Sequence, residues 1–298
     1  MRIIKPSATR LPNNGLETCI DLIVRGARIC YASTIKGNEE KTLRHLITNG
    51  HMSPFAHGII HYPLHTLNNL MRDKVENRIL MNALSSKYTL IGDLYGTLCA
   101  TINCRTLIET IINMQAKNEL LTEKDDTYTI FMELLERSKY IAYIQDFEKE
   151  PVRFVTVEID TNLAVGRELE RHISYMLYYN EQSTRYCNFT KDKFSNSVAF
   201  LEPHWYSENE QRAKEWEEDC ITHENMYFRR LNNGWNLDDA RKCLPLETHT
   251  KIMITANISA WKHLLEQRLY EKTGKVDPDM MRCAELINTA IYYGAKQD

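Results

Sequence analysis

Hydrophobic and polar residues follow two different periods along the chain. Apolar residues recur at helical spacing in the segments 13–31, 39–48, 162–179, 207–231, 258–271 and 278–292. Short apolar or alternating runs predict strands over 58–62, 153–160, 198–201 and 248–256. Because strands alternate with helices, we expect an α/β (α+β) fold with a mixed central sheet flanked by helices.

Residues 64–150 are the part of the chain that separates most easily from the rest. Their periodicity is mostly helical, and no linker rich in Pro, Gly or Ser divides the chain. We therefore expect a single domain over 1–298 that contains a mostly helical insertion at 64–150. The segment 101–106 echoes 255–260, although the likeness is too short to indicate a repeat.

The charge of the chain is nearly balanced. Lys and Arg number 37 against 40 Asp and Glu, the formal net charge is −3, and no block of like charge stands out. Nucleic-acid binders usually carry a basic excess or a basic stripe. We therefore expect no nucleic-acid partner and, as ligand, a small anion bound by a few arginines.

Neither the N-terminus nor any internal run predicts insertion into a membrane. The run Met1 to Lys5 is charged too early for a secretory signal, and the longest apolar candidate, 173–179, has about a third of the length of a membrane span. The eight cysteines contain no Cys-x-x-Cys pair, which favours reduced thiols over disulfides or a zinc site. We expect a cytoplasmic protein.

Familiar metal and nucleotide motifs are missing from the sequence. His57, His61 and His65 are spaced by four residues, but Pro63 interrupts any helix there and no Cys or carboxylate stands at a matching position. We expect no metal site. The absence of Gly-x-Gly-x-x-Gly, Gly-x-x-x-x-Gly-Lys and Gly-x-Ser-x-Gly argues against a Rossmann dehydrogenase, a P-loop kinase and a serine hydrolase elbow.

Two polar clusters are the candidates for chemistry. The first comprises Arg171-His172 and the run 180–186, which follows an apolar helix; the second comprises 240–245, Asn257 and the helix that carries His263 and Arg268. Arginine offers a planar donor fork that suits a phosphate or the edge of an imide ring. The alternative for both clusters is a solvated helix end whose arginines pair with nearby carboxylates.

Three blocks of the sequence match a known family in the same order. The run 181–189, Glu-Gln-Ser-Thr-Arg-Tyr-Cys-Asn-Phe, resembles the signature of the flavin-dependent thymidylate synthases. The run 50–57 resembles that family's Gly-His turn, and 240–268 resembles its C-terminal block. The resemblance covers most of the chain between about 27 and 268.

The resemblance implies both a fold and a reaction. Members have an α/β domain, assemble as homotetramers with active sites between subunits, and methylate dUMP to dTMP. Methylenetetrahydrofolate donates the carbon, and FAD reduced by NADPH supplies the hydride. Members lack a catalytic cysteine, and an arginine-rich pocket polarises the pyrimidine instead.

The same resemblance assigns candidate roles residue by residue. It implies that Arg268 and Ser183 are catalytic, and that substrate is held by Arg171, Glu181, Ser183, Arg185, Arg241 and Arg268. It further implies that the flavin is contacted by Ser53, His172, Asn257 and His263. We expect Ser183 to act through a hydroxyl contact, because no His-Asp pair that could activate it as a nucleophile is evident.

The sequence departs from the family mainly on the flavin side. Ile173 and Ser259 stand where the family has arginines, Ala56 replaces a glutamate, and His263 replaces an asparagine. The stretch 174–182 is two residues longer than the family's, which would rotate a helix by about 200° unless a loop absorbs it. FAD should therefore bind weakly, unless other groups compensate, the candidates being His172, His263, Arg105 and Lys262.

Three functional hypotheses remain open on the sequence. The first is dUMP methylation with folate and flavin. The second is a folate-dependent synthesis of another C5-modified pyrimidine nucleotide, such as hydroxymethyl-dUMP, with little or no use of flavin. The third is a nucleotide-binding protein without activity, against which the retained Arg185, Arg241 and Arg268 argue, since an idle pocket has no need of cations.

Overall fold

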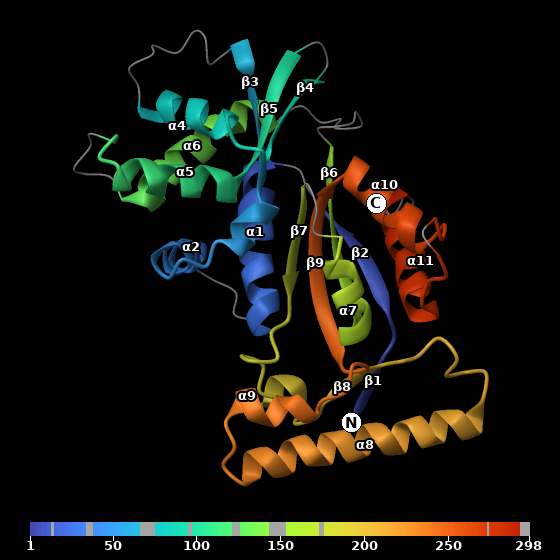
Figure 1. The fold of residues 1–298 in the computed structure, drawn as a ribbon. Coiled ribbons are helices and arrows are strands. Elements are labelled where there is room, and N and C mark those ends of the chain that lie inside the picture. The colour runs from blue at the N-terminus through green and yellow to red at the C-terminus, as the bar shows by residue number, and fades with distance from the viewer. Residues whose placement is uncertain are drawn as a thin grey trace.

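The computed structural model describes residues 1–12, 15–33, 38–65, 75–94, 97–120, 126–142, 153–172, 176–272 and 274–292. A central sheet runs through the molecule, with a smaller sheet and its helices at one end and a long helix lying across the other end (Figure 1). No helix within these ranges is both long enough and apolar enough to cross a membrane.

The α/β class with helices flanking a central sheet is confirmed, but the expectation of a mixed central sheet is wrong, because all its described strand pairs are antiparallel. Its strand order is β2 (Ser7–Leu11), β6 (Phe154–Asn162), β9 (His249–Asn257) and β7 (Leu177–Glu181), and neighbouring strands are antiparallel. A parallel pair, β1 (Arg2–Ile4) with β8 (Ala199–Leu201), forms a separate short sheet. The strands predicted at 153–160, 198–201 and 248–256 therefore exist.

Helices cover both faces of the central sheet. One face packs on α7 (Leu163–Glu170), α10 (Ile258–Arg268) and α11 (Pro278–Tyr292), with Trp261 fully buried and its indole N–H donating to the carbonyl of Val155 at 3.0 Å. The other face packs on α1 (Gly15–Tyr31), which α2 (Glu39–Thr48) flanks. Apolar burial on both faces is the main source of stability of such a layered fold.

The end of the molecule opposite the smaller sheet is built around α8 (Glu210–Asn232). This helix packs against the short elements η2 (Asp192–Phe194), α9 (Leu237–Ala240) and η3 (Arg241–Cys243) in one apolar cluster. Glu224 of α8 is buried and ties the cluster to the first strand, because it accepts from the N–H of Val198 at 2.7 Å and from the N-terminal ammonium at 2.8 Å.

The segment 64–150 contains a β-hairpin that the periodicity did not predict. Its helices are α4 (Val75–Leu84), α5 (Cys104–Ala116) and α6 (Thr127–Ala142), and between them lie β4 (Thr89–Leu94) and β5 (Thr97–Asn103). β5 pairs with β4 and with β3 (Ile59–Pro63), which precedes the segment. Because residues 99–103 of β5 are all buried, they show no alternation, and such a run resembles a buried helix by pattern alone.

The helix predicted over 162–179 is wrong in its second half. α7 ends at Glu170 and β7 begins at Leu177, so the apolar spacing belongs to two elements that meet the same core. Met176 has a positive φ of 67°, which a helix does not permit. The other predicted helices are found, with ends that agree to within a few residues.

The likeness between segments 101–106 and 255–260 arises because each segment spans the end of a strand and the start of a helix. At each, a strand ends in an asparagine whose side-chain oxygen accepts from the backbone N–H three residues later, Thr106 for Asn103 and Ala260 for Asn257. Asparagine is a preferred N-cap because it satisfies one of the free N–H groups at a helix start. The likeness is therefore local chemistry and carries no sign of a repeat.

A buried histidine fastens the N-terminal half to the central sheet. His57 ends the turn η1 (Ser53–His57) and has no exposed surface; its Nδ1 lies 2.8 Å from Oγ1 of Thr255 on β9, and its Nε2 lies 3.1 Å from Oδ1 of Asn180 on β7. The amide nitrogen of Asn180 donates to the carbonyl of Gly26, so its oxygen faces the ring. Nε2 therefore carries the proton, and Nδ1 accepts from Thr255.

The His57 ring leaves no room for a side chain at position 26. A Cβ on Gly26 would lie 2.8 Å from Cδ2 of His57, which is shorter than van der Waals contact. Gly26 therefore allows α1 to pass close to the histidine while its own carbonyl holds Asn180.

Replacement of His57 should lower stability and change its pH dependence. Burial lowers the pKa of His57 from 6.5 to about 4, so the neutral ring stabilises the fold above pH 6.5 and this contribution is lost as the pH falls toward 4. His57→Ala should reduce the free energy of unfolding at pH 7 by about 1–3 kcal/mol, because buried partners lose their hydrogen bonds. His57→Gln should flatten the decline in stability between pH 6.5 and 4 in urea titrations.

The matched control is His45→Gln, because His45 is an exposed residue of α2. It should leave the pH profile unchanged. If His57→Gln showed the same slope as the unmodified protein, the neutral buried histidine would not contribute to stability in this way.

Candidate active site

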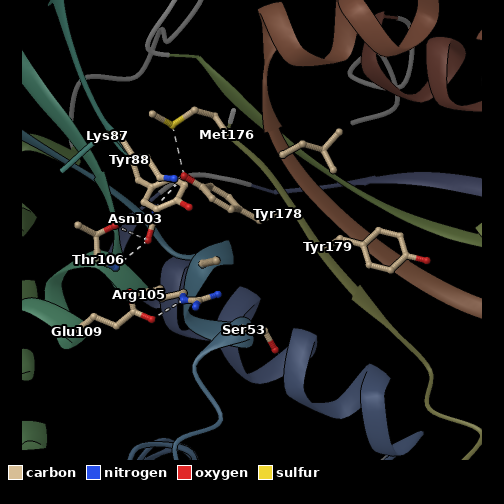
Figure 2. Close-up of a pocket in the computed structure, with 12 residues that line it drawn as sticks. Ser53, Lys87, Tyr88, Asn103, Arg105, Thr106, Glu109, Met176, Tyr178 and Tyr179 are labelled. Carbon is tan, nitrogen blue, oxygen red and sulfur yellow. Dashed lines mark hydrogen bonds and ion pairs between the residues drawn. The ribbon is translucent and has the colours of Figure 1, made fainter. Parts of the chain in front are cut away.

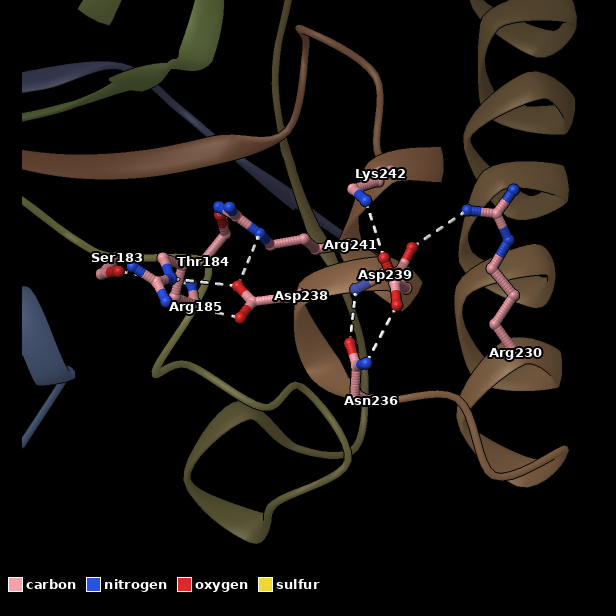
Figure 3. A network of polar contacts seen from close by, with 9 residues as sticks. All are labelled: Ser183, Thr184, Arg185, Arg230, Asn236, Asp238, Asp239, Arg241 and Lys242. Atoms are coloured by element: carbon pink, nitrogen blue, oxygen red, sulfur yellow. Dashed lines mark hydrogen bonds and ion pairs between the residues drawn. The ribbon is translucent and has the colours of Figure 1, made fainter.

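One arginine from each of the two polar clusters meets around a single carboxylate. Arg185, in the turn after β7, donates through Nε to Oδ1 of Asp238 at 3.0 Å, and Arg241 donates through Nη1 to Oγ1 of Thr184 at 2.8 Å (Figure 3). Nε of Arg241 lies 3.5 Å from the same Asp238 oxygen without hydrogen-bond geometry, and it is buried with no acceptor among the described residues. We call Arg185 and Arg241 the arginine pair.

Backbone contacts fix the turn that carries Arg185. Gln182 donates its N–H to the carbonyl of Lys251 at 2.8 Å, and Ser183 donates to the carbonyl of Cys30 at 3.0 Å, so the turn bridges β9 and the end of α1. Arg241 is held from the other side, since it begins η3 directly after α9. The sequence therefore brings together Ser183, Arg185 and Arg241 from segments more than fifty residues apart.

The arginine pair has more positive charge than its immediate partner neutralises. Two guanidinium groups share the single carboxylate of Asp238, while neighbouring Asp239 is paired with Lys242 at 2.7 Å. Arg185 is 57% exposed and Arg241 33%, so an incoming anion can reach both groups. A phosphate would supply the acceptor that Nε of Arg241 lacks.

Arg268, the last residue of α10, lies in a different network. Its Nη1 is 2.8 Å from Oε2 of Glu168 on α7, and its Nε donates to Nε2 of His172 at 2.8 Å. Burial, together with the charges of Arg268 and His263, lowers the pKa of His172 to about 4, so the ring is neutral and accepts from Arg268. Of the two partners that the sequence allowed for Arg268, a carboxylate or a ligand, the chain itself provides the carboxylate.

Glu181 points toward the same side as Arg268. Its carboxylate accepts from the hydroxyl of Thr250 at 2.9 Å and from the hydroxyl of Tyr179 at 3.1 Å. Burial raises the pKa of Glu181, and the charges of Glu170 and Arg167 on α7 also act on it. Among the described residues, no hydrogen bond or ion pair links Glu181 to the arginine pair, so one chain separates the predicted substrate contacts into two groups.

The predicted flavin contacts offer mostly neutral groups. Ser53 is exposed at the start of η1, His263 is exposed on α10, and His172 is neutral beside Arg268. Asn257 is buried, and its side-chain oxygen already caps α10. Arg171, an exposed residue at the end of α7, is the cation that directly precedes His172 in the sequence.

The residues that differ from the family pattern likewise offer no charged group to a flavin, as far as the structure describes them. Ala56 is buried and presents no carboxylate, Ser259 is exposed and uncharged, and Ile173 lies outside the described residues. These groups are compatible with a flavin held by hydrogen bonds and do not provide a dedicated cation for its pyrophosphate.

Two cavities of about 510 Å³ each lie beside Ser53. The first, which we call the near cavity, is lined by Ser183 and Tyr186 as well as by residues of α1 and η1. The second, the distal cavity, lies between β7 and the β5–α5 junction (Figure 2). Both are bordered by Ser53, Arg105 and Glu109, so the two cavities adjoin, and we call them together the groove.

Sequence reasoning missed most of the distal cavity. Its lining includes Lys87, Tyr88, Asn103, Arg105 and Tyr178, of which only Arg105 had been considered, as a substitute cation for flavin. The strands that bring these residues together were read as helices, so the pattern gave no sign of a shared wall.

Metal ligands and disulfides do not enter the chemistry of the described residues. Within the ranges that the structure describes, no three His, Cys, Asp or Glu side chains group as a metal site would require. All eight cysteines are free thiols, and seven of them are buried.

Comparison with known proteins finds a family model that resembles the C-terminal part of the chain. Residues 151–287 match the family model Thy1, described as thymidylate synthase complementing protein. Over 94 residues the chain is 29% identical to a flavin-dependent thymidylate synthase from Pyrococcus furiosus, an alignment that spans 32% of this chain and 38% of the relative.

Solved structures that are similar to this chain include those of a UMP/dUMP methylase, PolB, from Streptomyces cacaoi. Its complexes with 5-Br dUMP and 5-Br UMP both align over 98% of this chain, and over 92% and 91% of theirs, with a TM-score of 0.44 and 15% identity. The family model and the curated relative therefore agree in kind: residues 151–287 are similar to the Thy1 family, and 94 residues of the chain are similar to a flavin-dependent thymidylate synthase.

Proposed function

We propose that the protein methylates C5 of a pyrimidine nucleotide, converting dUMP to dTMP with methylenetetrahydrofolate as carbon donor and reduced FAD, regenerated by NADPH, as hydride source. The observation that carries this proposal is the arginine pair in the region that the Thy1 model matches, with a buried Nε of Arg241 that finds no acceptor among the described residues. A buried donor without a partner is costly, and a nucleotide phosphate would satisfy it.

In this proposal the arginine pair holds the phosphate. Arg185 and Arg241 already converge on Asp238, and Thr184 fixes one nitrogen of Arg241, so the donors are oriented before ligand arrives. An incoming phosphate would compete with Asp238, whose own side chain is 51% exposed and therefore held weakly. Ser183 would add a neutral hydroxyl contact.

Arg268 would act on the base. A guanidinium that donates to the oxygens of the uracil imide stabilises the negative charge that develops in the ring as C5 attacks the one-carbon unit. Glu181 and Arg171 would complete the contacts to the nucleotide on that side. Because Arg268 and the arginine pair do not share contacts within one chain, we propose that a second subunit completes each site in a homotetramer.

FAD would be held by Ser53, His172, Asn257 and His263, and would supply hydride to the transferred carbon when reduced. His172 is fixed by its hydrogen bond to Arg268, and Asn257 by the start of α10. We propose a cytoplasmic location for this reaction.

The second candidate function is folate-dependent synthesis of another C5-modified nucleotide, such as hydroxymethyl-dUMP, which needs no hydride. The neutral donor set on the flavin side favours it, in particular Ser259 and Ala56 where the family has charged residues. The nucleotide contacts are the same in both proposals.

Release of tritium from dUMP labelled at C5 tests either form of the proposal. With methylenetetrahydrofolate, FAD and NADPH present, the full-length protein should release tritium into water, because substitution at C5 expels that hydrogen. No release above the rate without protein, at saturating dUMP, would overturn the proposed activity.

Replacement of Arg241 should weaken nucleotide binding and leave the fold intact. One lost charge-assisted hydrogen bond is worth roughly 1.5–3 kcal/mol, so Arg241→Ala should raise the Kd for dUMP about tenfold or more, with a nearly unchanged Tm. Calorimetric titration measures the Kd, and Arg212→Ala on exposed α8 is the control. An unaltered Kd, or loss of the folded state, would mean that Arg241 is structural.

Mixed oligomers should recover activity if the two groups of contacts come from different subunits. Arg241→Ala and Arg268→Ala should each be nearly inactive alone, whereas refolding or subunit exchange of the two together forms some sites with both arginines. Activity of the mixture well above the mean of the two variants is the expected result. A mixture that equals that mean would place both arginines in one subunit's site.

FAD should bind weakly enough to be lost during purification. Relative to the family, Ile173 and Ser259 each remove a cation, and two such contacts at roughly 1.5–3 kcal/mol each correspond to about a hundredfold or more in affinity. The visible spectrum of protein purified without added flavin should lack flavin bands, and titration should give a micromolar Kd. Yellow protein with stoichiometric FAD would contradict this prediction.

A further inference from the structure

The groove beside Ser53 extends beyond the residues that the proposed reaction uses. The near cavity begins at Ser183, and the distal cavity ends against Lys87 and Tyr88 on the approach to β4. The two cavities share Arg105 and Glu109 from the first turns of α5. A ligand longer than a nucleotide can therefore start near Ser183 and end in the segment 64–150, outside the region matched by the family model.

One wall of the distal cavity is a rigid aromatic ring. Tyr178 of β7 stacks on Phe154 with an angle of 4° between the rings. Its hydroxyl accepts from Nδ2 of Asn103 at 2.7 Å (Figure 2). The same hydroxyl donates to the sulfur of Met176, which has a positive φ of 67°. Strained backbone of this kind is often found beside ligand sites, where surrounding contacts maintain it.

The distal cavity also has available positive charge. Arg105 pairs with Glu109 at 2.7 Å, but the two side chains are 47% and 41% exposed, and such a pair is easily exchanged for another acceptor. Lys87 is exposed, with its ammonium 5.0 Å from the ring centre of Tyr88, and no carboxylate pairs with it among the described residues. The cavity therefore combines aromatic rings with two cations against one carboxylate.

We propose that the distal cavity binds the p-aminobenzoyl-glutamate tail of the folate, an inference that rests on the proposed function. The folate must present its one-carbon unit to the nucleotide, so its pteridine end lies toward Ser183 and its tail points along the groove. The benzoyl ring then lies beside Tyr178 and Tyr88, and the glutamate carboxylates meet Arg105 and Lys87.

The position of Lys87 favours a folate over FAD. In a folate the negative charge is at the end farthest from the reacting atoms, and Lys87 lines only the distal cavity, away from Ser183, whereas Arg105 borders both cavities. In FAD the pyrophosphate is central, with uncharged ring systems at both ends. Residues of the segment 64–150 would therefore determine affinity for folate, including a preference for tails with additional glutamates.

Calorimetric titration of the full-length protein with p-aminobenzoyl-glutamate, and separately with 5-formyltetrahydrofolate, tests this inference. Arg105→Ala and Lys87→Ala should each raise both Kd values about tenfold and leave the Kd for dUMP unchanged. Tyr178→Phe, which keeps the ring, should change the Kd values little, whereas Tyr178→Ala should weaken them. Lys214→Ala is the control, because Lys214 forms a similar exposed pair with Glu210 on distant α8.

Three results would overturn the inference. The first is that the wild-type protein binds neither folate compound. The second is that Arg105→Ala and Lys87→Ala give the same Kd values for the folate compounds as Lys214→Ala. The third is that Arg105→Ala and Lys87→Ala raise the Kd for FAD and leave the Kd values for the folates unchanged, which would make the distal cavity a flavin site. Tritium release from dUMP by wild-type protein is measured in parallel, so failure of the proposed reaction is distinguished from failure of the tail site.

Discussion

The hydrogen bonds of His57 are the interaction on which the rest of the site depends. They join the turn η1 to both β9 and β7, through Thr255 and Asn180, at a point with no access to solvent. Thr255 in turn bonds Thr156 on β6 at 2.8 Å, so three strands of the central sheet are coupled to one ring. A buried network of this kind stabilises a structure only when each member is satisfied, and here each has a partner.

Several features of the groove follow from this attachment. η1 carries Ser53, and the smaller sheet continues from it through β3, so the position of His57 determines how β5 and α5 stand relative to β7. The N–H of Cys104 donates to the carbonyl of Gly58 at 2.8 Å and links the start of α5 to the same turn. The groove is therefore walled by a sheet of the Thy1 region on one side and by the segment 64–150 on the other.

In the proposed function, local cations compensate for a formal net charge of −3 when an anionic nucleotide binds. The cations of the proposed sites are the arginine pair, Arg105 with Lys87, and Arg268. Among the described residues, each of these cations except Lys87 lies within ion-pair distance of a carboxylate. In the proposed function, an anionic ligand would replace that carboxylate as the acceptor. Specificity then depends on geometry, in particular on the fork of Arg241 held by Thr184.

Most of the secondary structure could be predicted from the sequence, because caps and periods are local properties. α2 has the predicted bounds, with Asn38 capping its start, and α11 does as well. The failures are β5, buried over most of its length, and β7, whose apolar residues continue the spacing of α7 into the same core. In both cases tertiary burial removes the alternation that identifies a strand.

The candidate site was predictable only in part, for a related reason. The turn 181–186 and Arg241 could be grouped because a family resemblance aligned them, and the structure does bring Arg185 and Arg241 together. The separation of Arg268 from them depends on tertiary packing, because Arg268 ends α10 and pairs with Glu168 of α7. The distal cavity depends on the missed hairpin, so no sequence pattern could have indicated Tyr178 or Lys87.

The identity of the product formed from dUMP tests the central claim most directly. The protein is incubated with dUMP, methylenetetrahydrofolate and FAD, with and without NADPH, and the nucleotide is analysed by mass spectrometry. We predict dTMP, formed only when NADPH is present. Unchanged dUMP under both conditions would contradict a C5 transferase, and hydroxymethyl-dUMP formed without NADPH would contradict reductive methylation.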